Sequence, residues 1–190
     1  LVHSNDVFGE LEPCGCRNNP AGGLARKARW LKTLSDSELI QLDAGDLLFP
    51  STSLPDALVP QARAQAQYVL KAYAMLKTDV ITPGEKDFAL GTEEFESLIS
   101  STSIPWISAN LMKANGKPLL DPFVVLKRKL PSGESYKIAI LGLSGEDILW
   151  PTGLKASSIT AVAREWLPKL HEKADLVVAL THQGLEADIA

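Results

Sequence analysis

Five short clusters of polar residues in this chain have the composition of a cation or phosphate site. Each cluster follows an apolar run and joins glycine or other small residues to carboxylate, amide or imidazole side chains. In chain order the clusters are Asn5-Asp6-Val7-Phe8-Gly9, Asp43-Ala44-Gly45-Asp46, Gly84-Glu85-Lys86-Asp87, Ala109-Asn110 and Thr181-His182-Gln183-Gly184. Oxygen ligands together with a histidine suit a hard or borderline divalent metal ion. Two such ions can hold a phosphoryl group and activate a water molecule.

A single cluster of this kind carries little information, because Gly-Asp after a strand is commonly only a helix cap. The five clusters gain meaning from the elements that precede them. In open α/β sheets, ligands bind beyond the carboxyl ends of the strands, and each cluster follows a predicted strand. We therefore expect a metal or phosphate site where these strand ends meet.

Those elements are predicted from the spacing of apolar residues. Helical spacing indicates helices over 24–34, 60–76, 93–99 and 156–171, and short apolar runs indicate strands over 1–5, 38–42, 79–82, 106–109, 123–130, 136–143 and 176–180. The turn residues at 131–134 predict a hairpin between two of these strands. Alternation of strands and helices, with one hairpin, predicts an α/β fold with a mixed sheet.

Length and composition limit the classes of protein to consider. The chain has 190 residues, of which 45% are hydrophobic and 22% charged, and a net charge of −4. We expect one domain over residues 1–190. The acidic balance argues against a nucleic acid polymer as partner, since such proteins need a basic surface. No apolar run is long enough to predict a transmembrane segment, and the oligomeric state stays open.

The chain has two cysteines, Cys14 and Cys16, separated by one glycine. This spacing differs from the CxxC pattern of zinc ribbons and thioredoxin-like motifs. Two thiols this close can ligate one soft metal, form a strained local disulfide, or remain free. All three possibilities remain open from the sequence.

The polar clusters, in their order along the chain, resemble those of the calcineurin-like metallophosphoesterases, and in particular the 5′-nucleotidase branch. The matching segments are His3-Ser4-Asn5-Asp6-Val7-Phe8-Gly9, Asp43-Ala44-Gly45-Asp46, Gly84-Glu85-Lys86-Asp87-Phe88, Ser108-Ala109-Asn110-Leu111 and Thr181-His182-Gln183-Gly184. The resemblance covers essentially the whole chain. It implies a four-layer αββα fold and hydrolysis of phosphate esters with two bound metals.

A second resemblance concerns the segment that contains the cysteines. Glu12-Pro13-Cys14-Gly15-Cys16, followed by Gly22-Gly23-Leu24-Ala25-Arg26, is similar to a bacterial subgroup of nucleotidase-like proteins that are generally exported. This similarity implies a periplasmic or otherwise exported protein.

Carried over residue by residue, the resemblance implies metal ligands at Asp6, Asp46 and His182. Glu85 stands where the family has a ligating asparagine, and we include it in the candidate metal set. The metal would be Mn, Zn, Mg or Ca, with full, partial or no occupancy. The family's later Gly-His-x-His ligands would follow Ala190, so we expect the domain to be truncated at its C-terminal end.

The candidate catalytic residues are Lys86, Asp87 and Asn110. Lys86 stands where the family has a histidine that protonates the leaving group or stabilises the transition state, and Asn110 would orient the substrate. Arg26, near the start of a predicted helix, is a candidate phosphate ligand, because helix N-termini and guanidinium groups both favour anions. The alternative is that Arg26 lies on a solvated helix face.

Two departures from the family pattern change the expected chemistry. Phe8 stands where the family has a histidine ligand, and Lys86 brings a fixed positive charge. We hypothesise that the Lys86 ammonium pairs with Asp46 or Asp6 and partly stands in for a lost metal; the alternative is that it points into solvent. A second hypothesis is that Cys14 or Cys16 folds back to replace the missing histidine.

Three functions remain in view. The leading one is a 5′-nucleotidase-like metallophosphoesterase domain that hydrolyses a small phosphomonoester, with nucleotides as candidate substrates, at a partly degenerate site. The second is a non-catalytic binding or scaffold domain on the same fold. The third is a redox or metal-handling protein that works through Cys14 and Cys16.

Overall fold

The computed structural model describes residues 1–13, 15, 22–34, 39–130 and 132–189. The strands are β1 (Val2–Ser4), β2 (Gln41–Asp43), β3 (Val80–Ile81), β4 (Leu111–Lys113), β5 (Phe123–Lys129), β6 (Ser135–Ser144), β7 (Leu154–Ala156) and β8 (Leu176–His182). The helices are α1 (Leu24–Lys32), α2 (Val59–Met75), α3 (Thr92–Ser100), α4 (Ile159–His171) and α5 (Leu185–Ile189), with short 3₁₀ helices η1 (Asp56–Leu58) and η2 (Glu85–Phe88). In the described part of the chain, no helix combines the length and apolarity needed to cross a membrane.

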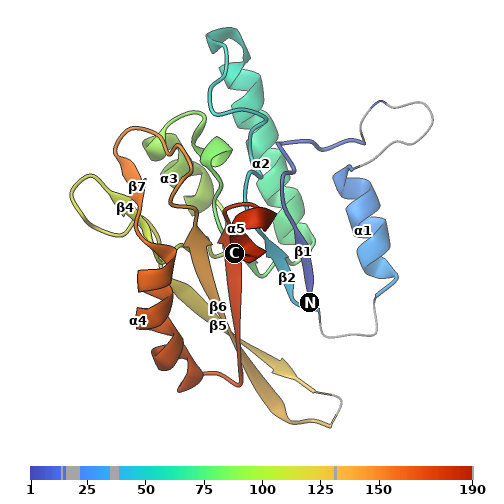
Figure 1. Ribbon diagram of the computed structural model, residues 1–190. Coiled ribbons are helices and arrows are strands. Elements are labelled where there is room, and N and C mark those ends of the chain that lie inside the picture. The colour runs from blue at the N-terminus through green and yellow to red at the C-terminus, as the bar shows by residue number, and fades with distance from the viewer. Residues whose placement is uncertain (14, 16–21, 35–38, 131, 190) are drawn as a thin grey trace.

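The strands form two three-stranded sheets and one small ribbon (Figure 1). The first sheet has the order β1-β2-β3 and is parallel throughout. In the second sheet, of order β5-β6-β8, β6 pairs antiparallel with β5 and parallel with β8. The ribbon pairs β4 with β7 antiparallel. The predicted mixture of parallel strands and one hairpin is confirmed.

The two larger sheets face each other across a hydrophobic core. Side chains alternate between the two faces of a strand, and the inward-facing residues of both sheets share one cluster. Leu42 and Val80 from the first sheet pack with Ile140 and Leu180 from the second. This contact makes the two sheets the inner layers of a sandwich.

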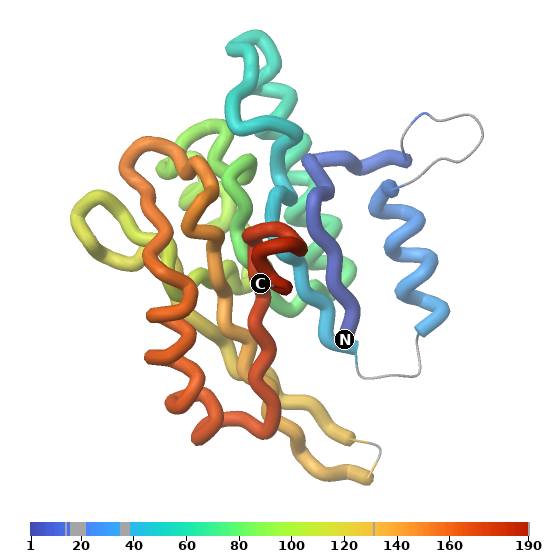
Figure 2. Tube along the Cα trace, viewed as in Figure 1, coloured from blue at the N-terminus to red at the C-terminus, as the bar shows by residue number. Residues whose placement is uncertain are grey.

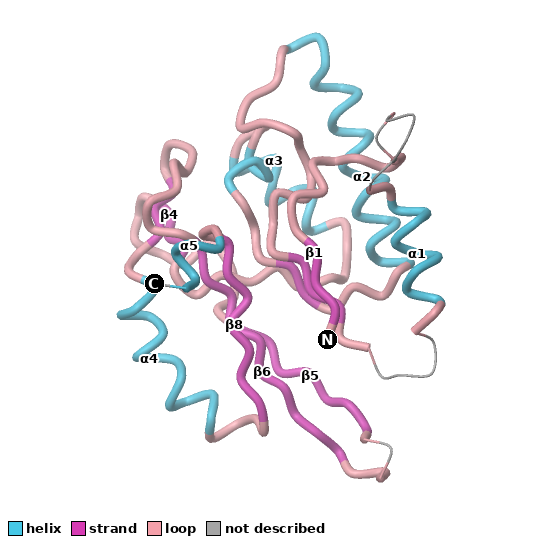
Figure 3. The backbone as a smooth tube through the Cα atoms, turned by 45° about the vertical axis from the view of Figure 1, so that its right-hand side comes forward, coloured by secondary structure: helices cyan, strands magenta, loops and turns pink. Residues whose placement is uncertain are grey.

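Helices cover the outer face of each sheet. Ile81, whose neighbour Val80 faces the other sheet, packs with Val69 and Tyr73 of α2. On the opposite side, Leu141 of β6 packs with Leu170 of α4. Figure 3 shows the strands as two groups, with α4 outside one and α1 and α2 outside the other. The predicted four-layer αββα architecture is therefore confirmed.

Several element boundaries differ from the sequence prediction. The strand expected over 106–109 is reduced to isolated bridges that Trp106 and Ile107 make to Ile81 and Asp121. The helix expected from 156 begins instead at Ile159, capped by the Ser158 hydroxyl. Its first expected residue belongs to β7, which pairs with β4.

Candidate metal centre

A cleft of about 620 Å³ opens where β1, β2, β3 and β8 end. The candidate residues that line it are Asp6, Asp46, Glu85, Lys86 and His182, which come from four of the five polar clusters. Figure 2 shows how this becomes possible: the red C-terminal segment of β8 and α5 lies near the blue N-terminal strand β1. The structure thus brings together the strand ends that the sequence analysis expected to meet.

Three side chains in the cleft form a compact group of potential metal ligands. One ligand atom each from Asp46, Glu85 and His182 lie within 4.8 Å of one another. His182 Nε2 is 3.0 Å from Glu85 Oε2 and 3.9 Å from Asp46 Oδ1. Metal–ligand bonds of about 2.0–2.6 Å place the ligand atoms of one ion at similar separations. One divalent cation therefore fits this group.

The orientation of His182 favours the same use. Its Nδ1 lies 2.6 Å from the main-chain oxygen of Ala44, and a carbonyl oxygen can only accept a hydrogen bond. Nδ1 therefore carries a hydrogen, which leaves Nε2 directed at Glu85 and Asp46. Metal-binding histidines are commonly oriented in this way by a hydrogen bond from the other ring nitrogen.

Without a metal, His182 and Glu85 form an ion pair. Burial lowers the pKa of His182, but hydrogen bonds to Glu85 and to the Ala44 carbonyl, together with the charges of Asp46 and Glu85, outweigh burial and raise that pKa to about 9. The hydrogen bond from His182 is the main reason that the pKa of Glu85 falls to about 2. The proton on Nε2 thus occupies the position that a metal ion would take.

Lys86 enters the cleft and pairs with Asp46. Its ammonium contacts Asp46 Oδ2 and lies 3.6 Å from Glu85 Oε1, while its main-chain N–H donates to Asp46 Oδ1 at 2.9 Å. The ammonium also lies 4.6 Å from the centre of the Phe8 ring. Burial alone would lower the pKa of Lys86, but the hydrogen bond and charge of Asp46 raise it. The predicted pairing with Asp46 is confirmed, and the solvent-directed alternative is wrong.

The loops that follow β1 and β2 hold strained backbone conformations next to the cleft. Asp6, Phe8 and Asp46 have φ angles of 55°, 55° and 53°, in a region that residues other than glycine rarely adopt. Two backbone hydrogen bonds join the loops, from Asp6 N–H to the Gly45 oxygen and from Phe8 N–H to the Asp46 oxygen. Such strain is concentrated at functional sites, where the surrounding structure maintains it.

Gly84 is required where the second and third loops meet. A Cβ atom at this position would lie 2.2 Å from Asp46 Oδ1 and 2.6 Å from His182 Cε1. Both neighbours belong to the potential metal group, so a side chain here would displace them. The glycine that precedes Glu85 is thus explained by the close approach of three chain segments.

Asp87 holds together the loops that follow β2 and β3. Its buried carboxylate accepts hydrogen bonds from the N–H groups of Leu47 and Leu48 at 2.8 Å, Gly84 at 2.9 Å and Asp46 at 3.1 Å. Burial raises the pKa of Asp87 to about 7, against the effect of these donors. Its side chain is not among the described residues that line the cleft. These contacts give Asp87 a structural role, and the catalytic role stays a prediction.

Asn110 is also buried away from the cleft. Its amide donates to the main-chain oxygens of Ser144 and Ser157, and its Oδ1 accepts from the Ser144 N–H at 2.7 Å. These bonds join the segment before β4 to the end of β6 and to the residue after β7. The substrate contact predicted for Asn110 is not provided by any of them.

The remaining candidates are Arg26 and the two cysteines. Arg26 is exposed on α1 and is absent from the described walls of the cleft. Cys14 and Cys16 lie outside the described residues, so the hypothesis that a thiolate replaces the missing histidine stays a prediction.

Two contributors to the site were missed in the sequence. The Ala44 carbonyl is a backbone atom, and residue type gives no signal for its role. Phe8 was identified only as a lost ligand, whereas its ring lies against the Lys86 ammonium. Phe8 and Lys86 each stand where the family has a histidine. This paired replacement by an aromatic ring and a cation is a signal that could have indicated their contact.

Comparison with solved structures identifies the class of fold. The chain superimposes on the calcineurin-like phosphoesterase YfkN from Bacillus subtilis with a TM-score of 0.78 at 20% identity, over 97% of this chain and 62% of that one. A 5′-nucleotidase precursor from Thermus thermophilus gives a TM-score of 0.76 at 22% identity, over 98% of this chain and 38% of that one. The fold is that of the calcineurin-like phosphoesterases.

No family model matches the chain, but its sequence is similar to those of several nucleotidases. The chain is 27% identical to a 5′-nucleotidase of Vibrio cholerae over 97% of its own length and 33% of the relative's. It is 25% identical to a 2′,3′-cyclic-nucleotide 2′-phosphodiesterase/3′-nucleotidase of Yersinia enterocolitica, over 87% and 28%. These similarities confirm the resemblance to the 5′-nucleotidase-like metallophosphoesterases. The chain spans about a quarter to a third of the length of these relatives.

Proposed function

We propose that this chain is the metal-binding domain of a phosphoesterase that hydrolyses a phosphate monoester, with nucleotides as the substrate class. The observation that carries the proposal is the convergence of Asp46, Glu85 and His182 in one cleft, with Nε2 of the histidine directed at both carboxylates. The nucleotide class is supported by the names of the relatives, which are nucleotidases and a nucleotide phosphodiesterase.

The residues in and behind the cleft would have different roles in the reaction. Asp46, Glu85 and His182 would hold a divalent metal, and mixed carboxylate and imidazole ligands suit Mn²⁺ or Zn²⁺. When bound, such an ion acts as a Lewis acid and lowers the pKa of a water ligand. The Lys86 ammonium, on a side chain that is 25% exposed, supplies positive charge for a phosphate oxygen. Asp87 is a positioning residue, because it binds the backbone of both loops.

A second function is favoured by one observation. Lys86 already neutralises Asp46, so the carboxylate does not depend on a metal for its counter-charge. A domain that binds phosphorylated molecules without hydrolysing them would use the same cleft. An assay of hydrolysis separates the two functions.

The assay uses the full-length protein after removal of metals with EDTA. Mn²⁺ or Zn²⁺ is then added back with p-nitrophenyl phosphate or nucleoside monophosphates as substrate. We expect metal-dependent release of phosphate. We also expect Asp46→Asn and His182→Asn to lower kcat/KM about 100-fold or more, because each removes a ligand of the metal that stabilises charge in the transition state. Glu165→Gln, an exposed change on α4, is the matched control. Absence of hydrolysis with either metal would favour the non-catalytic function.

We also propose that residues 1–190 form one domain and that the protein is exported from a bacterial cytoplasm. The shared core between the two sheets supports the first statement, and the similarity of the segment around Cys14 and Cys16 to exported proteins supports the second. Cell fractionation tests export: recovery of the full-length protein in the periplasmic or extracellular fraction is expected, and recovery in the cytosol contradicts it.

A further inference from the structure

We infer that Lys86 is a built-in cation that occupies the place of one metal ion, so that this centre binds one divalent cation rather than two. The inference rests on the proposed function, because it concerns the same cleft. It gives a role to both departures from the family pattern, Phe8 and Lys86, whose side chains lie against each other beside Asp46.

The first argument is the surroundings of the ammonium. The Phe8 ring, which offers no lone pair to a metal, lies 4.6 Å from Lys86 Nζ. The face of an aromatic ring attracts a cation through its negative quadrupole. At the position where the resemblance implies a histidine ligand, the chain thus has a side chain suited to an ammonium ion and unsuited to a metal.

The second argument is the way that Asp46 uses its two oxygens. Oδ2 contacts the Lys86 ammonium, whereas Oδ1 faces His182 Nε2 at 3.9 Å. A carboxylate can bridge two cations by giving one oxygen to each. Here Asp46 bridges the ammonium and the remaining cation position. The Lys86 N–H bond to Oδ1 at 2.9 Å holds the same carboxylate from the backbone, which fixes this division.

The third argument is charge. Asp6, Asp46, Glu85 and Asp188 line the cleft, and the ammonium contacts Asp46 and lies near Glu85. A fixed positive charge is thus already placed among the carboxylates that a second metal ion would neutralise. A second divalent ion would have to approach Asp46 beside a fixed positive charge, and repulsion between like charges is strong where water is excluded.

The substitution has a chemical consequence. An ammonium gives three N–H donors and a point charge, so Lys86 can bind an oxygen of the substrate phosphate. It cannot act as a Lewis acid on a water molecule. Lys86 therefore takes over phosphate binding, and activation of water is left to the single metal position formed by Asp46, Glu85 and His182.

The test counts Mn²⁺ ions bound to the full-length protein by equilibrium dialysis, with electron paramagnetic resonance to detect coupling between neighbouring ions. We expect the unaltered protein to bind one Mn²⁺ per centre with an uncoupled signal. The double variant Phe8→His/Lys86→Met removes the ammonium and adds an imidazole, so we expect two coupled ions.

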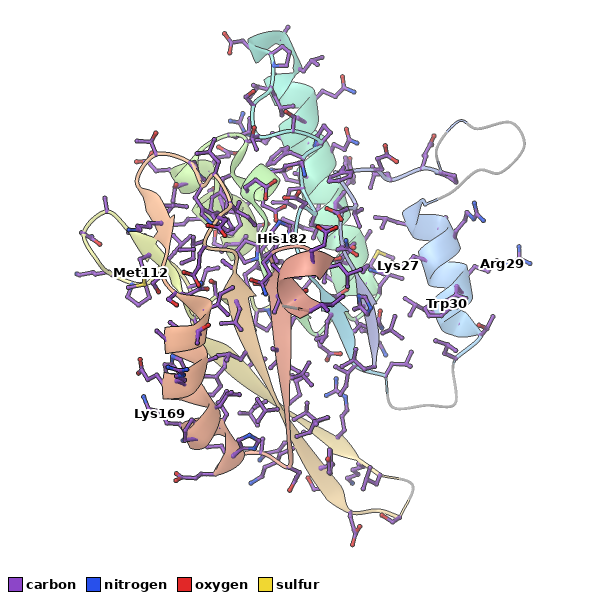
Figure 4. All side chains as sticks on the ribbon, viewed as in Figure 1. Lys27, Arg29, Trp30, Met112, Lys169 and His182 are labelled. Carbon is purple, nitrogen blue, oxygen red and sulfur yellow. The ribbon has the colours of Figure 1, made fainter. Side chains whose placement is uncertain are left out.

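Lys169→Met is the matched control. Lys169 contacts a carboxylate and an aromatic ring as Lys86 does, with Glu165 at 2.8 Å and the Trp166 ring at 4.7 Å. It lies on α4, well away from His182 (Figure 4), so its loss should leave the count unchanged.

The outcomes separate the two proposals. Two ions bound to the unaltered protein would overturn the inference about Lys86 and leave the proposed function standing. No ion bound would overturn the proposed metal-dependent function itself. One ion in the unaltered protein and two in the double variant support both proposals. A double variant that keeps native circular dichroism but binds one ion would overturn the inference.

Discussion

At the scale of the residue, the two nitrogens of the His182 ring have different partners and therefore different roles. Nδ1 is held by the Ala44 carbonyl, and Nε2 meets Glu85. The same geometry supports an ion pair in the absence of metal and a ligand group in its presence. The His182 side chain is only 14% exposed, so it is largely shielded from solvent both in the ion pair and as a potential metal ligand.

This ion pair predicts how stability of the metal-free protein depends on pH. The pKa of His182 rises from 6.5 to about 9, so its contribution to stability is complete below pH 6.5 and is lost as the pH rises through 9. The pKa of Glu85 falls from 4.5 to about 2, so its contribution is complete above pH 4.5 and is lost as the pH falls through 2. We expect the pair to contribute most between pH 4.5 and pH 6.5.

Urea unfolding in EDTA, from acid pH to above pH 9, measures how the free energy of unfolding depends on pH. Glu85→Gln should reduce the fall in the free energy of unfolding that the unaltered protein shows at alkaline pH, since His182 then loses its charged partner. Glu172→Gln, at an exposed position, is the control. An unchanged pH profile in Glu85→Gln would contradict the ion pair.

At the scale of the element, short strands are followed by loops that are bonded to one another. The Asp87 carboxylate in η2 collects N–H groups from the loop after β2 and from the residue before η2. Glu85 and Lys86 begin the same 3₁₀ turn. The potential metal ligands Asp46 and Glu85 are therefore positioned by one buried side chain that lies behind the cleft.

This arrangement predicts a large effect for Asp87→Asn. The amide has one oxygen, so two buried N–H groups lose their acceptor, and each buried unsatisfied donor costs about 1–3 kcal/mol. We expect the free energy of unfolding to fall by about 2–6 kcal/mol, measured by urea unfolding at pH values above the raised pKa of Asp87. A loss below about 0.5 kcal/mol, the range of neutral surface changes, would contradict the role assigned to Asp87.

A related prediction concerns the contact between the loops. Gly84→Ala places a methyl group against Asp46 Oδ1 and His182 Cε1, so we expect Mn²⁺ affinity to fall about 10-fold or more, as for other losses of ligand support. Gly116→Asn is the control, because a Cβ atom there would meet nothing within 4 Å and asparagine tolerates its φ of 76°. Equal Mn²⁺ affinity in Gly84→Ala, measured by calorimetry, would contradict the described packing.

At the scale of the whole molecule, the sequence predicted what depends on local pattern. Apolar runs that include Leu42 and Val80 indicate strands, and the order of the polar clusters indicates the fold family. A site near both Asp46 and His182 was expected from the rule that ligands bind beyond the carboxyl ends of strands. Because β2 and β8 belong to different sheets, the two side chains meet only through the packing of one sheet on the other. The four-layer sandwich was predicted through the family resemblance.

What the sequence did not predict depends on tertiary contacts. The short strands β4 and β7 are stabilised by pairing with each other, and three residues give too weak a pattern to indicate a strand. Asp87 and Asn110 were included among the catalytic candidates because they lie in the polar clusters that resemble those of the family. Their burial and backbone partners, which set them apart, appear only in the folded chain.

The most direct test of the metal centre is a crystal structure of the Mn²⁺-loaded full-length protein, with anomalous diffraction to locate the metal. The structure predicts one peak within coordination distance of Asp46, Glu85 and His182 Nε2, with the Lys86 ammonium retained between Asp46 and Phe8. Absence of a peak at these three residues, or a peak in place of the ammonium, would contradict this account.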